Sequence, residues 1–307
     1  MDKIIEIKNL SKIFGTFIAV NKISFDVYKG QLFAFLGSNG AGKSTTINII
    51  CGILNKDGGE ILIDNTSIDE NSMNIKQKIG IVFQNSVLDK NLTVFENLRN
   101  KAMLYGLNNE EFLINLKNLV DSLDFSDYLL KIIKNLSGGQ IRKVDIARAL
   151  IHNPSILILD EPTTGLDPST RKTVWQFLDK MKSNKNLTIF LTTHYMEEAS
   201  DCDYIVILDK GKIVAQGTPN FLKEKHTNDT IKIYSIKNKK TIIDTLTSEG
   251  FNARNSNDCI VVEIDEILKA KKLIINHPDF FDDFELIKGK MDDVFINVTN
   301  KKLEGEQ

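Results

Sequence analysis

Residues Gly37-Ser38-Asn39-Gly40-Ala41-Gly42-Lys43-Ser44-Thr45 fit the pattern G-x-x-x-x-G-K-[ST] of a phosphate-binding loop, or P-loop. In such a loop the backbone N–H groups cradle phosphates, the lysine reaches the outer phosphates, and the next hydroxyl faces a magnesium ion. The apolar run 31–36 before the loop predicts a buried strand, and residues 44–50 after it predict a helix whose positive end faces the anion. This order of strand, P-loop and helix predicts an α/β core that binds a nucleotide, in preference to a glycine-rich turn that binds nothing.

A second glycine-rich stretch, Leu136-Ser137-Gly138-Gly139-Gln140, precedes residues 141–150, whose apolar side chains recur at helical spacing. Ser137 is a suitable N-cap and the two glycines leave the backbone open to a ligand, so the stretch predicts a second helix start that can receive an anion. On its own, this stretch would be interpreted as a plain capped helix. Together with the P-loop, it resembles the signature motif in the ATP-binding subunits of the ABC transporter family. The resemblance implies that residues 137–140 of one copy cap the ATP held by the P-loop of another copy.

Three polar residues at the ends of later apolar runs extend the resemblance. Asp160, which ends the run 156–160, matches the carboxylate that holds magnesium in the family, usually through water. Glu161 matches the base or polariser of the attacking water, and His194 matches the histidine that contacts the terminal phosphate. An isolated Asp-Glu pair would more often mark a turn, and a lone histidine would more often be structural. Here all three fall in register with the other motifs, which favours the functional interpretation.

Three further positions match residues of the same family. Gln84, after the apolar run 79–83, matches the glutamine that approaches magnesium and links the ATP site to the helical insertion. Asp167 lies in a loop that resembles the one in which the family places an aspartate that acts across the dimer. Phe14 lies where the family usually carries a ring, most often tyrosine, that stacks on adenine; core packing is the alternative for this side chain. The implied cofactors are ATP and Mg²⁺, with Ser44, Gln84 and Asp160 at the metal.

The apolar segments predict an α/β P-loop NTPase core over residues 1–217. Alternating residues within 3–29 predict an antiparallel β-sheet ahead of the P-loop, and helical spacing from residue 92 predicts a helical insertion that forms a subdomain at about 85–150. Continuous apolar runs are typical of parallel strands buried on both faces, and they occur at residues 156–160, 187–192 and 204–208.

Residues 218–307 are predicted to form a small α+β domain with an accessory or regulatory role. Strand-like and helix-like segments alternate there in a βαββαβ order, which is the ferredoxin-like arrangement. The segment 294–298 has helical spacing and could cover its own sheet or an opposing subunit, and self-packing is the simpler alternative. Two stretches resemble the drug- and antibiotic-exporter branch of the bacterial ABC ATPases, namely 291–295 and 192–199.

Composition narrows the possible partners and compartments. The formal net charge of -2 gives no electrostatic case for nucleic acid. The opening residues do not resemble a signal peptide, and no apolar run reaches the roughly 20 residues that a membrane-spanning helix needs. The three cysteines are isolated, which argues against a disulfide framework or a zinc site and suits a reducing cytosol. We therefore expect a soluble chain that reaches the cytoplasmic face of the membrane through another polypeptide.

The resemblance implies an ATPase that powers a membrane transporter, with export of a drug, antibiotic or lipid-like compound as the expected function. The expected partners are a separate transmembrane permease subunit, docked near residues 84–98, and a second ATP-binding subunit, with a homodimer favoured. The alternative is a soluble ABC ATPase that acts on nucleic acid or ribosomes, but such proteins tend to carry two ATPase units or a long coiled-coil insertion. A regulatory module without turnover is disfavoured by Glu161.

Overall fold

The computed structural model describes residues 2–70, 72–182, 187–234, 239–265 and 267–299. The chain divides into two compact units, Met1–Gln216 and Gly217–Gln307. The first unit holds two sheets and a group of helices, and the second holds a single sheet with its own helices. The fold predicted from the sequence, an α/β core followed by a small α+β domain, is confirmed.

The N-terminal sheet of the first unit is antiparallel, as predicted, with the order β2-β1-β4-β5. One face is buried because apolar residues alternate along its strands, and its Phe25 ring lies 5.4 Å from the Phe33 ring of the central sheet. This contact joins the two sheets in one hydrophobic core. The strands are β1 (Lys3–Phe14), β2 (Phe17–Tyr28), β4 (Gly58–Ile63) and β5 (Thr66–Ser67).

The central sheet has six strands in the order β10-β9-β3-β8-β7-β6, and the neighbours from β9 to β6 pair in parallel. Every residue of β3, β7 and β8 is buried, as their continuous apolar runs predict. Since parallel strands end at the same edge, the residues that follow them gather there. The strands are β3 (Leu32–Gly37), β6 (Ile79–Val82), β7 (Ile156–Asp160), β8 (Thr188–Thr193), β9 (Tyr204–Asp209) and β10 (Lys212–Gly217).

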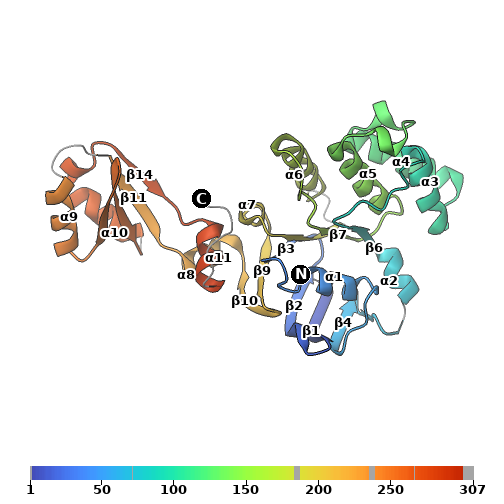
Figure 1. The fold of residues 1–307 in the computed structure, drawn as a ribbon, viewed down its shortest axis with the longest axis horizontal. Coiled ribbons are helices and arrows are strands. Elements are labelled where there is room, and N and C mark those ends of the chain that lie inside the picture. The colour runs from blue at the N-terminus through green and yellow to red at the C-terminus, as the bar shows by residue number, and fades with distance from the viewer. Residues whose placement is uncertain (1, 71, 183–186, 235–238, 266, 300–307) are drawn as a thin grey trace. The chain divides into compact units, whose positions relative to one another are not determined.

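The predicted helical insertion consists of α3 (Val94–Leu104), α4 (Asn109–Leu123) and α5 (Gly138–Leu150). Each of these helices begins with a reciprocal capping box, which satisfies two of its free N-terminal amides. Figure 1 shows the three helices gathered on the far side of the central sheet from β1, β2 and β4. The other helices of the unit are α1 (Lys43–Ile50), α2 (Ser72–Lys78), α6 (Pro168–Lys182) and α7 (Met196–Ala199).

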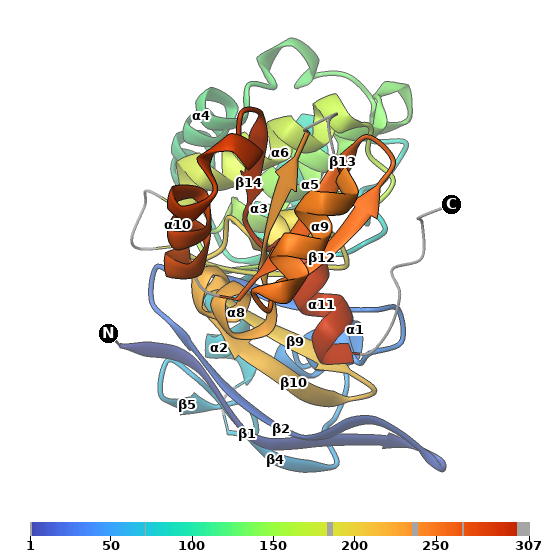
Figure 2. The same cartoon turned by 90° about the vertical axis from the view of Figure 1, so that its left-hand side faces the viewer.

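The second unit contains an antiparallel sheet with the order β12-β13-β11-β14. With α9 and α10 inserted along the chain, this is the predicted βαββαβ arrangement, and both helices pack on one face of the sheet (Figure 2). The elements are β11 (Asp229–Ile233), α9 (Lys239–Ser248), β12 (Asn252–Ser256), β13 (Cys259–Ile264), α10 (Ile267–Asn276) and β14 (Phe284–Ile287).

Two further helices of the second unit, α8 (Pro219–His226) and α11 (Met291–Thr299), pack against each other. Val294 and Phe295 of α11 are buried, and Asn297 donates a 2.7 Å hydrogen bond to the carbonyl of His226. The closing segment therefore packs within its own unit, as the simpler alternative predicted, although on α8. Across the described parts of both units, every helix is too short or too polar to span a bilayer.

Candidate active site

The P-loop connects the end of β3 to the start of α1 in the first unit. Gly40 and Gly42 adopt left-handed backbone conformations, with φ of 79° and 107°. A Cβ atom on Gly42 would lie 2.5 Å from the carbonyl oxygen of Ala19, and one on Gly37 would lie 2.7 Å from that of Leu208. Glycine is therefore required at residues 37 and 42 by close backbone packing, and at residues 40 and 42 by the backbone conformation.

Lys43, the first residue of α1, extends back across this loop. Its Nζ donates to the carbonyls of Gly37 (2.7 Å) and Ser38 (3.3 Å) and lies 3.4 Å from Oε1 of Glu161. The side chain is only 4% exposed, and burial lowers the pKa of Lys43 while the Glu161 carboxylate opposes that change. The loop thus holds a buried ammonium group beside the backbone amides where the pattern requires one.

Asp160 and Ser44 place two oxygen donors next to each other. Oδ1 of Asp160 lies 3.3 Å from Oγ of Ser44 and accepts a 2.7 Å hydrogen bond from Oγ1 of Thr192 on β8. Carboxylate and hydroxyl oxygens are ligands that Mg²⁺ prefers, and this ion keeps several waters rather than requiring a full protein cage. The pair therefore fits magnesium.

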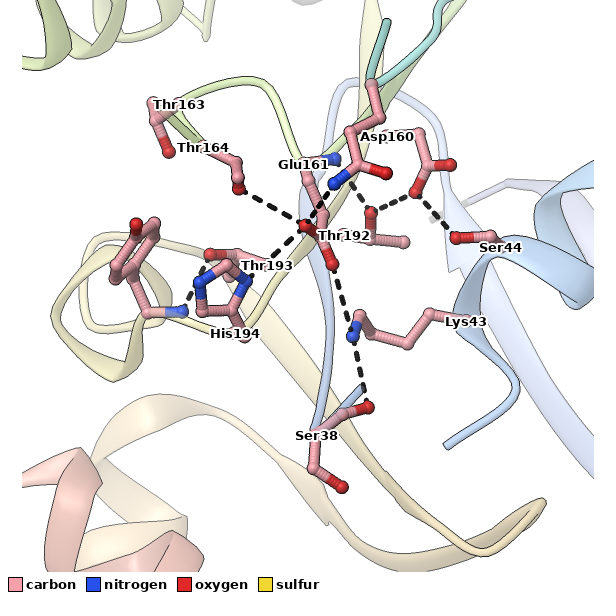
Figure 3. A network of polar contacts seen from close by, with 12 residues as sticks. Ser38, Lys43, Ser44, Asp160, Glu161, Thr163, Thr164, Thr192, Thr193 and His194 are labelled. Atoms are coloured by element: carbon pink, nitrogen blue, oxygen red, sulfur yellow. Dashed lines mark hydrogen bonds and ion pairs between the residues drawn. The ribbon is translucent and has the colours of Figure 1, made fainter. Parts of the chain in front are cut away.

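Glu161 lies at the centre of the site (Figure 3). Its Oε2 accepts hydrogen bonds from Nε2 of Gln84 (3.1 Å) and Oγ1 of Thr164 (3.2 Å), and Nδ1 of His194 lies 3.5 Å away. The residue is 8% exposed and has a left-handed backbone, with φ of 48°, which a non-glycine residue adopts at a cost. A strained, buried carboxylate surrounded by polar groups is typical of a functional site.

These residues line a cavity of about 560 Å³ in the first unit. Two of the lining rings, Phe14 and Phe17, are 48% and 60% exposed, and Nζ of Lys12 lies 5.4 Å from the centre of the Phe14 ring. The predicted aromatic residue is thus free of the core, because it precedes the tight turn between β1 and β2. The cavity is lined by Phe14, Phe17, Ala19, Asn39, Gly40, Gly42, Lys43, Ser44, Thr45, Gln84, Glu161, Thr164 and His194.

The predicted residues of the signature motif are placed elsewhere. Ser137 is the N-cap of α5 and forms the capping box with Gln140, and residues 137–140 do not line the cavity. A Cβ atom on Gly138 would meet open space, whereas one on Gly139 would lie 2.5 Å from Cγ2 of Thr170. Gly138 therefore leaves the backbone open as predicted, while Gly139 also serves internal packing against α6, which the sequence did not predict.

Asp167, the other residue assigned to a second copy, also lies outside the cavity. Its two carboxylate oxygens accept 2.6 Å hydrogen bonds from the hydroxyls of Ser169 and Thr170 at the start of α6. These hydrogen bonds lower the pKa of Asp167, so its side chain remains ionised at the N-terminus of that helix. Through Thr170, Asp167 is connected to the packing surface of Gly139.

Sequence reasoning missed several residues that shape the site. Thr192 accepts a 2.9 Å hydrogen bond from the backbone N–H of Glu161 while it donates to Asp160, so it ties the two acidic residues together. Its signal in the sequence was weak, because Thr192 is one of three threonines in the buried strand β8. Phe17 was detectable as a second ring beside the turn that follows Phe14. Thr164 lies within the loop already singled out, and only its contact with Glu161 reveals its place in the site.

Several known proteins are similar to this chain. A family profile described as "ABC transporter" matches residues 20–164, and one described as "AAA domain, putative AbiEii toxin, Type IV TA system" matches residues 132–199. The "Nod factor export ATP-binding protein I" of Cupriavidus pinatubonensis is 31% identical over 302 residues, which cover 98% of this chain and 92% of that protein. The chain belongs to the ABC transporter ATP-binding family.

The fraction of a relative's length that aligns with this chain differs among the relatives. The "Probable multidrug ABC transporter ATP-binding protein YbhF" of Escherichia coli is 37% identical over 228 residues, or 74% of this chain. The chain spans only 39% of the length of that relative. A solved "dimeric structure of a post-hydrolysis state of the ATP-binding cassette MJ0796 bound to ADP and Pi" matches with a TM-score of 0.63 and 28% identity, and covers 70% of this chain and 98% of that one.

Proposed function

We propose that this ABC family chain is the ATP-hydrolysing subunit of a membrane exporter. The observation that carries the proposal is the arrangement of Lys43, Gln84, Glu161 and His194 around one cavity at the carboxyl edge of a parallel sheet. A phosphate cradle, an ammonium group and a candidate base within hydrogen-bond distance of polar partners are the parts that phosphoryl transfer to water requires.

Several residues at the cavity have a proposed role. The amides of the P-loop and Lys43 bind the phosphates of ATP, and Phe14 stacks on the adenine. Ser44 and Asp160 would hold magnesium with support from Gln84, and the bound ion would supply positive charge that neutralises the transferring group. Glu161 accepts the proton of the attacking water, and His194 donates to the terminal phosphate. All of these side chains except Asp160 line the cavity, and Asp160 lies next to Ser44, which supports the proposed roles.

A second copy is proposed to complete the site. Ser137, Gly138, Gly139, Gln140 and Asp167 lie outside the cavity, although Gly138 faces open space at a helix start that suits an anion. The N–H groups and hydroxyl at the start of α5 would therefore meet the ATP of another copy, with Asp167 beside them. The dimeric form of the solved relative supports this proposal. Two copies would close on two ATP molecules and reopen after hydrolysis.

The names of the relatives support export as the purpose of the ATPase cycle. We infer a drug, antibiotic or lipid-like compound as the exported class and a separate transmembrane permease as the partner. The permease would dock near residues 84–98 and hold the chain at the cytoplasmic face of the membrane. The net charge of -2 offers no electrostatic support for the alternative, an ABC ATPase that acts on nucleic acid.

Two substitutions test the proposed roles. Glu161→Gln should keep ATP binding and lower turnover by at least about a hundredfold, because a general base contributes about that much to the rate. Lys43→Ala should weaken ATP binding itself. The matched control is Glu60→Gln, which removes an exposed carboxylate on β4 and should leave both measurements unchanged. Hydrolysis by Glu161→Gln at the wild-type rate would assign the base to another residue.

A further inference from the structure

Arg142 is a buried cation on α5 that the catalytic assignments above do not use. It is 5% exposed and lies five residues after Ser137, one turn into the helix. Its guanidinium donates to the carbonyl oxygens of Phe83 (2.7 Å), Pro162 (2.6 Å) and Glu161 (3.0 Å), and Nη2 also approaches that of Gln84 at 3.5 Å. One side chain thus connects α5 to the loop after β6 and to the loop after β7.

This arrangement is specific to a guanidinium group. Arginine presents five N–H donors in a fixed planar fork, whereas lysine has a single ammonium on a flexible stem and cannot span the same set of carbonyls. The hydrogen bonds of Arg142 go to main-chain oxygens, so the side chain fixes backbone positions rather than pairing with one carboxylate. Removing a buried partner leaves such carbonyls unsatisfied, which is costly.

The carbonyls that Arg142 holds belong to the residues whose positions matter most for hydrolysis. Glu161 has the left-handed backbone, and the carbonyls of Glu161 and Pro162 both accept from the guanidinium. On the other side, the carbonyls of Phe83 and Gln84 are held while Nε2 of Gln84 donates to the Glu161 carboxylate. Arg142 therefore holds the loops of Gln84 and Glu161 together from behind the cavity.

We propose that Arg142 is a positioning residue that couples the two ATP sites of the dimer. The start of its own helix, at residues 137–139, would meet the ATP of the opposite copy, while its side chain holds Glu161 and Gln84 of the same copy. A displacement of α5 when the opposite ATP binds is transmitted by the guanidinium to the base of the near site. This inference rests on the proposed dimeric ATPase and adds a route between its sites.

Steady-state ATPase kinetics of the full chain test the proposal. Arg142→Gln should lower kcat by about 10- to 100-fold, since small displacements of a catalytic group cost about that much, and change the KM for ATP by less than about threefold. The Hill coefficient for ATP should exceed one in the wild type and fall towards one in the variant. Arg142→Lys should be intermediate, because an ammonium can satisfy part of the carbonyl set.

The control is Lys143→Gln, the next residue on α5, which removes a cation whose Nζ donates to the carbonyl of Asp124 at 3.4 Å, away from the carbonyls that Arg142 holds. It should keep the wild-type kcat and Hill coefficient. The double variant Arg142→Lys with Glu161→Gln should still dimerise with ATP, because the start of α5 is intact. Far-ultraviolet circular dichroism checks that each variant is folded, and Arg142→Lys decides the test if Arg142→Gln does not fold.

The outcomes separate this inference from the proposed function. A folded wild-type chain without ATPase activity, alone and with its membrane partner, would contradict the proposed function itself. An active wild type with a Hill coefficient of one would overturn the coupling. Wild-type kcat and Hill coefficient in Arg142→Lys and Arg142→Gln would overturn the positioning role while leaving the ATPase proposal intact.

Discussion

Gly139→Ala is the substitution whose effect follows most directly from the packing of α5 against α6. The added Cβ would lie 2.5 Å from Cγ2 and 2.9 Å from Oγ1 of Thr170. Carbon atoms in contact prefer about 3.5–4.0 Å, so Thr170 has to move by about 1 Å. Because its hydroxyl donates a 2.6 Å hydrogen bond to Asp167, the movement also strains the start of α6. Gly138→Ala is the matched control, since a Cβ there meets no atom within 4 Å.

The expected change in the free energy of unfolding of Gly139→Ala is a balance of two effects. Overpacking a filled site costs about 1–3 kcal/mol, and replacing glycine by alanine within a helix returns about 0.5–1 kcal/mol. Gly139→Ala should therefore lower the free energy of unfolding by about 1–2 kcal/mol, while Gly138→Ala should leave it equal or slightly higher. For a unit of this size that difference corresponds to a fall of about 3–6 °C in the melting temperature of Gly139→Ala. Thermal unfolding without nucleotide measures it separately from any loss of ATP contacts.

A second substitution identifies the clashing atom. Thr170→Ser removes Cγ2 and keeps the hydroxyl that binds Asp167, so combined with Gly139→Ala it should recover most of the lost stability. Recovery in this double-mutant cycle would assign the cost to the methyl group. Equal melting temperatures for the Gly138→Ala and Gly139→Ala proteins, or no recovery with Thr170→Ser, would show that Gly139 does not pack against the Thr170 methyl group.

Three other perturbations have defined outcomes. Thr192→Val removes the hydroxyl that joins Asp160 to the amide of Glu161, so stability should fall by about 1–3 kcal/mol and turnover should fall with it; unchanged melting and ATPase rates would contradict this. His152 is neutral in the folded chain because burial lowers its pKa to about 4, so the unfolded chain binds more protons between pH 6.5 and 4 and stability falls as the pH falls through that window. At pH 5, His152→Phe should reduce this loss in the free energy of unfolding by about 1–2 kcal/mol. Identical pH profiles of the melting temperature in the variant and the wild type would contradict this expectation. A chain truncated after Gly217 should retain its ATP affinity, measured by calorimetry; loss of binding in a folded truncation would show that the second unit contributes to the site.

The parts of the fold that sequence predicted best are those set by local patterns. Continuous apolar runs identified the buried parallel strands, and the helix predicted at residues 44–50 after the P-loop matches α1, which begins one residue earlier at Lys43. Strand β1 runs from Lys3 to Phe14, but its alternation is interrupted where Asn9 has a φ of 50° and the pairing with β2 shifts register between Ile7 and Leu10. Such irregularities interrupt the period of two that the prediction relies on.

The parts of the site that sequence missed depend on contacts between distant segments. Arg142 and Thr192 carry no motif of their own. The carbonyls that Arg142 binds lie 19 to 59 residues away in the chain, and Thr192 binds the amide of Glu161 and the carboxylate of Asp160, 31 and 32 residues away. The left-handed backbone of Glu161 likewise follows from the turn that β7 makes into its loop. Gly139 fits the signature pattern, yet its packing against Thr170 is visible only once α5 and α6 are placed.

The central claim is that two copies share ATP between the P-loop of one and the start of α5 of the other. The most direct measurement is the mass of Glu161→Gln by light scattering, with saturating ATP and magnesium and then with ADP. A shared site should give twice the chain mass of 34.7 kDa with ATP and a return to the single-chain mass with ADP. Adding Ser137→Arg, which places a bulky cation at the proposed contact, should keep the protein monomeric. A Glu161→Gln protein that binds ATP and stays monomeric would contradict the shared site.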